Sequence, residues 1–136
     1  MNNRLNILLV DDSLLISKRL QKQLLEIDCV EYVFLAENFL EAQKVLNNHT
    51  VHIALLDINL PGKNGIDLLK FISNEYPLIQ CVMITNQDEI RYRKLCNQLG
   101  CVGFLDKSRD LDILPELIER LSTNCKSDQL PLYISP

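Results

Sequence analysis

The segment Ile53-Ala54-Leu55-Leu56-Asp57 is an apolar run that ends on a carboxylate. A run of about four to eight apolar residues is typical of a buried strand in a parallel sheet. Three further runs end on polar groups in the same way: 7–10 before Asp11 and Asp12, 82–84 before Thr85, and 102–105 shortly before Lys107. Ligands bind beyond the carboxyl ends of the strands in an open α/β sheet. We therefore expect these polar side chains to meet at one edge of one sheet.

The rest of the chain alternates strand-like and helix-like segments, which predicts βαβ units and a parallel sheet. Strands are expected at residues 5–10, 30–35, 53–57, 79–84 and 102–105. The strand at 30–35 contains Glu31, which favours a place at the sheet edge. Helices are expected at residues 13–27, 38–46, around 66–72, from 88 to a glycine cap at 100, and from a cap at Asp112 to 121. Pro115 must lie in the first turn of the last helix, which favours Asp112 over Asp110 as its cap.

The composition is that of one ordinary globular domain. The chain has 136 residues, of which 47% are hydrophobic and 24% are charged. The apolar periodicity stops at Ser122, so we expect a domain over residues 1–122 and a C-terminal tail or linker stub over residues 123–136. The five cysteines lack the paired spacing of a zinc site or disulfide framework. Cys81 and Cys101 are expected to act as small hydrophobic residues.

The net charge and the hydropathy pattern argue against several kinds of partner. A formal net charge of −4 argues against a nucleic-acid surface or an anionic membrane as partner. No apolar run approaches the roughly 18 residues of a membrane span. The first residues also lack the pattern of a signal peptide. We therefore expect a cytoplasmic protein with no direct contact to nucleic acid or membrane.

The polar groups at the strand ends suit a cation and a phosphoryl group. Asp11 and Asp12 repel each other unless a cation lies between them and a third carboxylate, and Mg²⁺ prefers oxygen ligands. Asp57 could serve as a metal ligand and as a nucleophile, because aspartate carboxylates accept phosphoryl groups as acyl phosphates. Catalysis of that transfer is mostly positioning and charge neutralisation, which the cation, Lys107 and Thr85 could supply.

Each of these residues also has an ordinary structural explanation. Asp12 could cap a helix and Asp57 could lie in a turn. Thr85 could be a simple strand residue and Lys107 a solvated charge. Four independent coincidences at equivalent strand ends would be needed, so the combined pattern favours a phosphoryl-binding site.

Together these motifs resemble the receiver domain of bacterial two-component response regulators. The resemblance covers about residues 4–122 and rests on Asp11-Asp12, on Asp57-Ile58-Asn59-Leu60-Pro61 with Gly65, on Thr85, and on Phe104-Leu105-Asp106-Lys107. It implies a single doubly wound, flavodoxin-like α/β fold. In that fold five parallel strands have the order 2-1-3-4-5, with helices on both faces.

The resemblance also implies a role for each site residue. Asp57 would be the phosphoacceptor, and Mg²⁺ would be held by Asp11, Asp12, Asp57 and the backbone carbonyl of Asn59. Thr85 and Lys107 would hold the phosphoryl group, and Phe104 would be the switch aromatic. Three positions would tune the lifetime of the phosphoryl group: Asn59, Asn86 and Gln87.

Two of the departures from the family pattern concern the loop after the fifth strand and the switch position. The family often has proline after the lysine of the fifth strand, in a cis peptide, whereas this chain has Lys107-Ser108. A cis bond before serine costs about 2.5–4 kcal/mol, so the geometry of this loop stays open. Phe104 replaces a tyrosine, so the switch aromatic has no hydroxyl to hydrogen-bond.

The implied function is a phosphorylatable signalling switch that at most catalyses its own phosphorylation and dephosphorylation. A sensor histidine kinase or phosphotransfer protein would donate the phosphoryl group. The surface of the fourth helix, fifth strand and fifth helix would then change and control a downstream protein. The basic cluster at 91–94 is interpreted as the ordinary solvated side of a helix.

Other functions stay open at this point. A phosphatase of the haloacid dehalogenase type would need a second carboxylate where this chain has Asn59. A receiver-like binding scaffold would work without phosphorylation. The chain could also be the receiver fragment of a longer regulator.

Overall fold

The computed structural model describes residues 4–86 and 90–126, and its strands form one parallel sheet. The sheet has five strands in the order β2-β1-β3-β4-β5. Their bounds are Leu5–Val10 for β1, Val30–Ala36 for β2, Ile53–Leu56 for β3, Gln80–Thr85 for β4 and Gly103–Asp106 for β5. The predicted fold class is confirmed, including the place of β2 at an edge.

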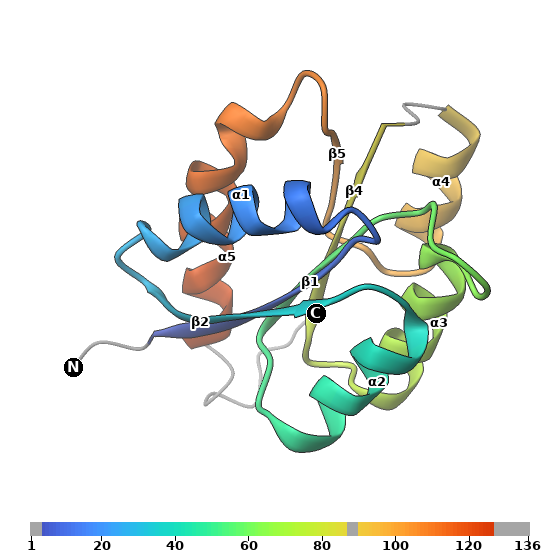
Figure 1. The fold of residues 1–136 in the computed structure, drawn as a ribbon, viewed down its shortest axis with the longest axis horizontal. Helices are drawn as coiled ribbons and strands as arrows, with labels where there is room; N and C mark the ends of the chain where they lie inside the picture. The colour runs from blue at the N-terminus through green and yellow to red at the C-terminus, as the bar shows by residue number, and fades with distance from the viewer. Residues whose placement is uncertain (1–3, 87–89, 127–136) are drawn as a thin grey trace.

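Helices cover both faces of this sheet (Figure 1). Their bounds are Leu14–Leu25 for α1, Phe39–Asn48 for α2, Gly65–Glu75 for α3, Ile90–Gln98 for α4 and Leu114–Lys126 for α5, with a 3₁₀ turn at Leu111–Ile113. The helices α1 and α5 pack on one face, and α2, α3 and α4 pack on the other. No helix in the described ranges is long and apolar enough to cross a membrane.

The central strand β3 shows why its sequence is a continuous apolar run. Successive side chains of a strand point to opposite faces of the sheet. Ile53 and Leu55 therefore pack with α1 and α5, while Ala54 and Leu56 pack with α2 and α3. All four residues are completely buried because helices cover both faces. The free cysteines Cys81 and Cys101 are buried too, as predicted.

Side-chain caps begin the first three helices. The Ser13 hydroxyl accepts from the Ile16 N–H, and the Asn38 side chain accepts from the Glu41 N–H at 2.9 Å. The third helix has a full capping box, in which Asn64 accepts from Asp67 N–H and Asp67 accepts from Asn64 N–H. These caps fix where the chain turns back after each of the first three strands.

The start of the last helix differs from the prediction. A 3₁₀ turn at 111–113 precedes α5, so Asp112 lies inside that turn and does not cap the helix. Asp110 has another task, because its carboxylate accepts from the Asp106 N–H at 2.9 Å. Pro115 does lie in the first turn of α5. The helix runs to Lys126, past the point at Ser122 where the apolar pattern ends.

Candidate functional site

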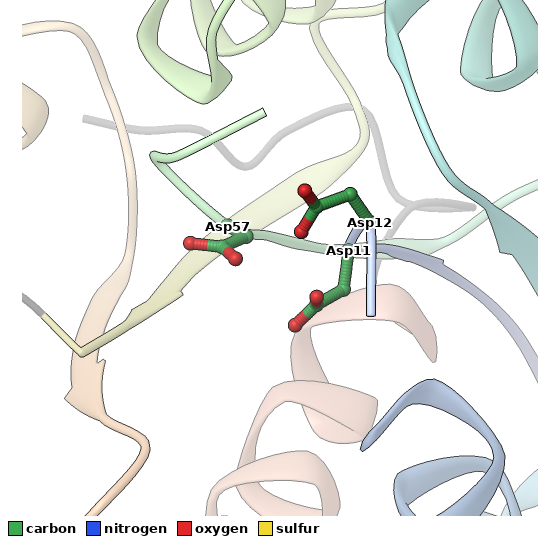
Figure 2. A group of neighbouring side chains, drawn as sticks. All are labelled: Asp11, Asp12 and Asp57. Carbon is green, nitrogen blue, oxygen red and sulfur yellow. The ribbon is translucent and has the colours of Figure 1, made fainter. Parts of the chain in front are cut away.

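Three carboxylates meet at the carboxyl edge of the sheet, as the strand-end pattern predicts. Figure 2 shows Asp11 and Asp12 at the end of β1 beside Asp57, which follows β3. One oxygen from each carboxylate lies within 4.8 Å of the other two. Asp11 and Asp57 are buried, whereas Asp12 is exposed. The cluster is therefore open to solvent through Asp12.

The register of the parallel strands brings these residues to one level. Val10 of β1 pairs with Leu56 of β3, so the next residue of each strand reaches the same edge. The Asp57 N–H donates to the carbonyl of Val10 at 3.0 Å, which continues the ladder by one residue. The meeting of Asp11 and Asp57 is thus a consequence of backbone pairing.

Lys107 lies between the two buried carboxylates. Its Nζ donates to Asp57 Oδ2 at 3.0 Å and also to Asp11 Oδ2. The Lys107 side chain is only 7% exposed, so it is not a solvated surface charge. Burial alone would lower the pKa of Lys107, but the hydrogen bonds and charges of Asp11 and Asp57 outweigh it and raise that pKa. The ammonium is therefore firmly protonated.

Opposing influences act on Asp57. Burial raises the pKa of its carboxyl group. The hydrogen bond and charge of Lys107 oppose that rise, as does the Asn59 N–H, which donates to Asp57 Oδ1 at 3.1 Å. The nearby charge of Asp11 adds to the rise. Three carboxylates and one ammonium leave a formal charge of −2, which a divalent cation would balance.

The other predicted site residues lie on or next to β4, on β5, or outside the described ranges. Thr85 ends β4, is completely buried, and its carbonyl accepts from the Lys107 N–H at 2.9 Å. Asn86 follows it and lines a hollow with Lys107. Phe104 lies on β5 and is buried against the α2–α3–α4 face. Gln87 falls in the segment 87–89, which the structure does not describe.

Gly65 has a structural task beside the site that the sequence motif alone did not explain. A Cβ atom at this position would lie 2.0 Å from the carbonyl oxygen of Asp57 and 2.7 Å from its carbonyl carbon. The Gly65 N–H also donates to the Ile58 carbonyl at 2.9 Å. Only glycine lets the start of α3 approach the backbone of Asp57 this closely.

Asp106 and Ser108 hold the loop that carries Lys107, and sequence reasoning missed this role. One oxygen of Asp106 accepts from both the Ser108 hydroxyl at 2.6 Å and the Ser108 N–H at 2.8 Å. The hydroxyl bond is the main reason that the pKa of Asp106 is lowered. The peptide bonds of the described residues are trans, including Lys107–Ser108. The serine thus fixes the loop through its side chain where the family often has proline.

The comparisons with known proteins identify the family. The model of the response regulator receiver domain matches residues 7–119. The chain belongs to this family. Receiver domains are signalling modules that bind Mg²⁺ at an acidic pocket, and this chain has such a pocket at Asp11, Asp12 and Asp57.

Relatives of this receiver domain include two transcriptional regulators. It is 29% identical over 103 residues to the regulatory protein MalR of Bacillus subtilis. The aligned segment covers 76% of this chain and 44% of MalR. It is also 30% identical over 95 residues to the DNA-binding transcriptional regulator NtrC of Escherichia coli. That aligned segment covers 70% of this chain and 20% of NtrC. The chain thus spans less than half the length of either relative.

A solved structure of similar length supports the fold. The CheY-like response regulator receiver domain protein of Methanospirillum hungatei is 27% identical, with a TM-score of 0.78. The match covers 91% of this chain and 98% of that protein. The flavodoxin-like arrangement of the sheet is therefore shared with a receiver domain protein.

The prediction that excludes nucleic acid as a partner is wrong as a general exclusion. NtrC is a DNA-binding regulator, and the Salmonella typhimurium response regulator RcsB, studied for its interaction with DNA, matches with a TM-score of 0.82 at 23% identity. The match covers 90% of this chain and 62% of the RcsB chain. The net charge of −4 belongs to the residues present here. That charge therefore does not exclude nucleic acid as a partner.

Proposed function

We propose that this receiver domain is a phosphorylatable switch in which Asp57 accepts the phosphoryl group. The position of the Lys107 ammonium carries the proposal, because it contacts Asp57 at 3.0 Å and Asp11 as well. A cation held by two carboxylates can turn to phosphoryl oxygens without leaving the pocket. An ordinary structural ion pair would not need the third carboxylate of Asp12 beside it.

The proposed reaction is the transfer of a phosphoryl group to a carboxylate. One oxygen of Asp57 forms a bond to phosphorus, the bond from phosphorus to the donor's leaving group breaks, and that group keeps the electron pair. The ionised carboxylate has no proton to lose, so no general base is required. Lys107 and the Asn59 N–H favour this ionised form against the burial of Asp57. Thr85, buried at the end of β4, is proposed to hold a phosphoryl oxygen together with Lys107.

The donor set of the pocket fits Mg²⁺. Asp11, Asp12 and Asp57 offer three oxygens within 4.8 Å of one another, and Mg²⁺ prefers hard oxygen ligands. The Ser13 N–H donates to Asp11 Oδ1 at 2.8 Å and thereby orients that carboxylate. The Asn59 backbone carbonyl completes the proposed set. When bound, the ion supplies positive charge that neutralises the transferred group.

The proposed output follows from the added charge. A phosphoryl group adds about −1.5 to −2 charges and strong acceptor oxygens. Thr85 would move toward them, Phe104 would fill the vacated space, and the α4–β5–α5 surface would change. A sensor histidine kinase or phosphotransfer protein is the proposed donor, and a protein binding that surface is the proposed target. The lifetime of the phosphoryl group would be set by Asn59, Asn86 and Gln87. The receiver unit would comprise residues 1–122. We also expect a cytoplasmic location.

The proposal is tested by weighing the intact protein after incubation with Mg²⁺ and a small acyl-phosphate donor. The parent should gain one phosphoryl mass, and Asp57→Asn should gain none. Omission of Mg²⁺ should abolish the gain in the parent. No gain in either protein refutes phosphorylation and supports a scaffold. Turnover of many equivalents of donor would point to a phosphatase instead.

A further inference from the structure

The ring of Phe104 lies under a charged side chain from α4. The guanidinium carbon of Arg93 is 4.7 Å from the ring centroid. Arg93 Nη1 also donates to the backbone carbonyl of Phe104 at 3.4 Å. A cation within about 6 Å of a ring centroid is attracted by the ring's electron-rich face. Arg93 therefore contacts both the side chain and the backbone of one residue of β5.

These contacts change the interpretation of the basic cluster at 91–94. Lys94 is exposed, as expected for the solvated side of a helix. Arg93 is exposed as a whole, but its guanidinium lies over the ring of Phe104, a residue that is only 8% exposed. Phenylalanine has no hydroxyl group that could hydrogen-bond and so fix the ring. Any polar interaction that fixes this ring must therefore be made by a neighbouring side chain.

Phe104 connects this contact to the candidate site. It pairs with Met83 of β4, two residues before Thr85, which ends the same strand. The three residues involved therefore lie on neighbouring elements: Arg93 on α4, Phe104 on β5 and Thr85 on β4. Together these elements lead from the α4 surface to the acidic pocket.

We infer that Arg93 is a positioning residue that holds the Phe104 ring in its observed rotamer and so sets how readily the switch moves. The significance of the ring's movement rests on the proposed function, whereas the contact itself does not. The planar guanidinium suits this role because it can stack on the ring while it hydrogen-bonds the carbonyl. The favoured state of the switch then depends on a residue of the α4 surface.

The inference is tested on the unphosphorylated full chain by measuring three-bond couplings that report the χ1 rotamer of Phe104. The parent should show one dominant rotamer. In Arg93→Ala the minor rotamers should rise about two- to fivefold, which is the range expected for loss of an exposed cation–π contact. Arg93→Lys should fall between the two, because it keeps the charge and loses the planar stack.

The matched control is Lys94→Ala, because Lys94 carries the same charge and lines the same surface hollow as Arg93 and Phe104. This control should leave the rotamer populations unchanged. Unchanged populations in Arg93→Ala, or an equal shift in Lys94→Ala, would overturn the inference. The coupling measurement needs no phosphodonor, so it gives its answer whether or not Asp57 accepts a phosphoryl group. Arg93→Ala should also gain the same phosphoryl mass as the parent, because Arg93 lies outside the acidic pocket.

Discussion

Replacement of Lys107 by methionine tests the electrostatics of the pocket most sharply. The change keeps a long apolar stem but removes the ammonium that Asp11 and Asp57 share. All three side chains are at most 8% exposed, so water can do little to replace the lost partner. Two buried carboxylates would then face each other without a cation.

The expected loss of stability follows from these contacts. Removing one partner of a buried ion pair costs about 3–5 kcal/mol. Two hydrogen bonds to charged groups, at about 1.5–3 kcal/mol each, give a similar sum. The two buried carboxylates, left without their cation, can take up a proton and recover part of this cost, so we expect a loss of about 3 kcal/mol near pH 7 without divalent cations.

Urea denaturation in the presence of a chelator measures this loss. With a slope of about 1–3 kcal/mol per molar urea, the midpoint should fall by at least about 1 M. The control is Lys70→Met, since Lys70 is exposed on α3 and its replacement should change stability by less than about 0.5 kcal/mol. Adding Asp57→Asn to Lys107→Met should recover part of the loss. A loss equal to that of the control would refute the burial of the ammonium between the carboxylates.

Three further predictions concern single residues of the site. Burial raises the pKa of Asp57, so its ionised form costs stability at neutral pH. Asp57→Asn should therefore unfold at a higher urea concentration than the parent at pH 7 without Mg²⁺. This difference in stability should vanish as the pH falls below 3.8, the ordinary pKa of an aspartate. A difference that grows in acid would contradict a raised pKa of Asp57. Gly65→Ala should lower the free energy of unfolding by about 3 kcal/mol in the same assay, because its Cβ would meet the Asp57 carbonyl. The control is Gly103→Ala, whose Cβ would meet only side chains at 3.3 Å or more, and it should lower that free energy by less than about 1 kcal/mol. Asp12→Ala should weaken Mg²⁺ binding at least about tenfold in a calorimetric titration, since even the loss of a group supporting a ligand costs about that much, and unchanged affinity would remove Asp12 from the metal site.

The sheet and the pocket were predictable from sequence because strand-end positions depend on a local pattern. Each apolar run ends where its strand ends, and parallel pairing then places Asp11 and Asp57 at one level. Lys107 followed from the same argument, since β5 lies in the same sheet.

The supporting contacts could not be predicted because they depend on loop paths and helix rotation. The bonds from Ser108 to Asp106 require a particular turn after β5. The 3₁₀ turn at 111–113, which places Asp112 away from the helix cap, is likewise a matter of the loop path. A basic cluster on a helix does not reveal which side chain lies over a distant ring, so the sequence alone does not distinguish Arg93 from Lys94. The clash that requires Gly65 depends on the approach of α3 to Asp57.

The claim that Asp57 is the phosphoacceptor is tested most directly by identifying the phosphorylated residue chemically. The protein is incubated with Mg²⁺ and an acyl-phosphate donor and then reduced with borohydride, which converts an aspartyl phosphate to homoserine. Peptide mapping should find homoserine at position 57 and aspartate at positions 11 and 12. Homoserine at another carboxylate, or none at all in protein that is folded and saturated with Mg²⁺, would contradict the role assigned to Asp57.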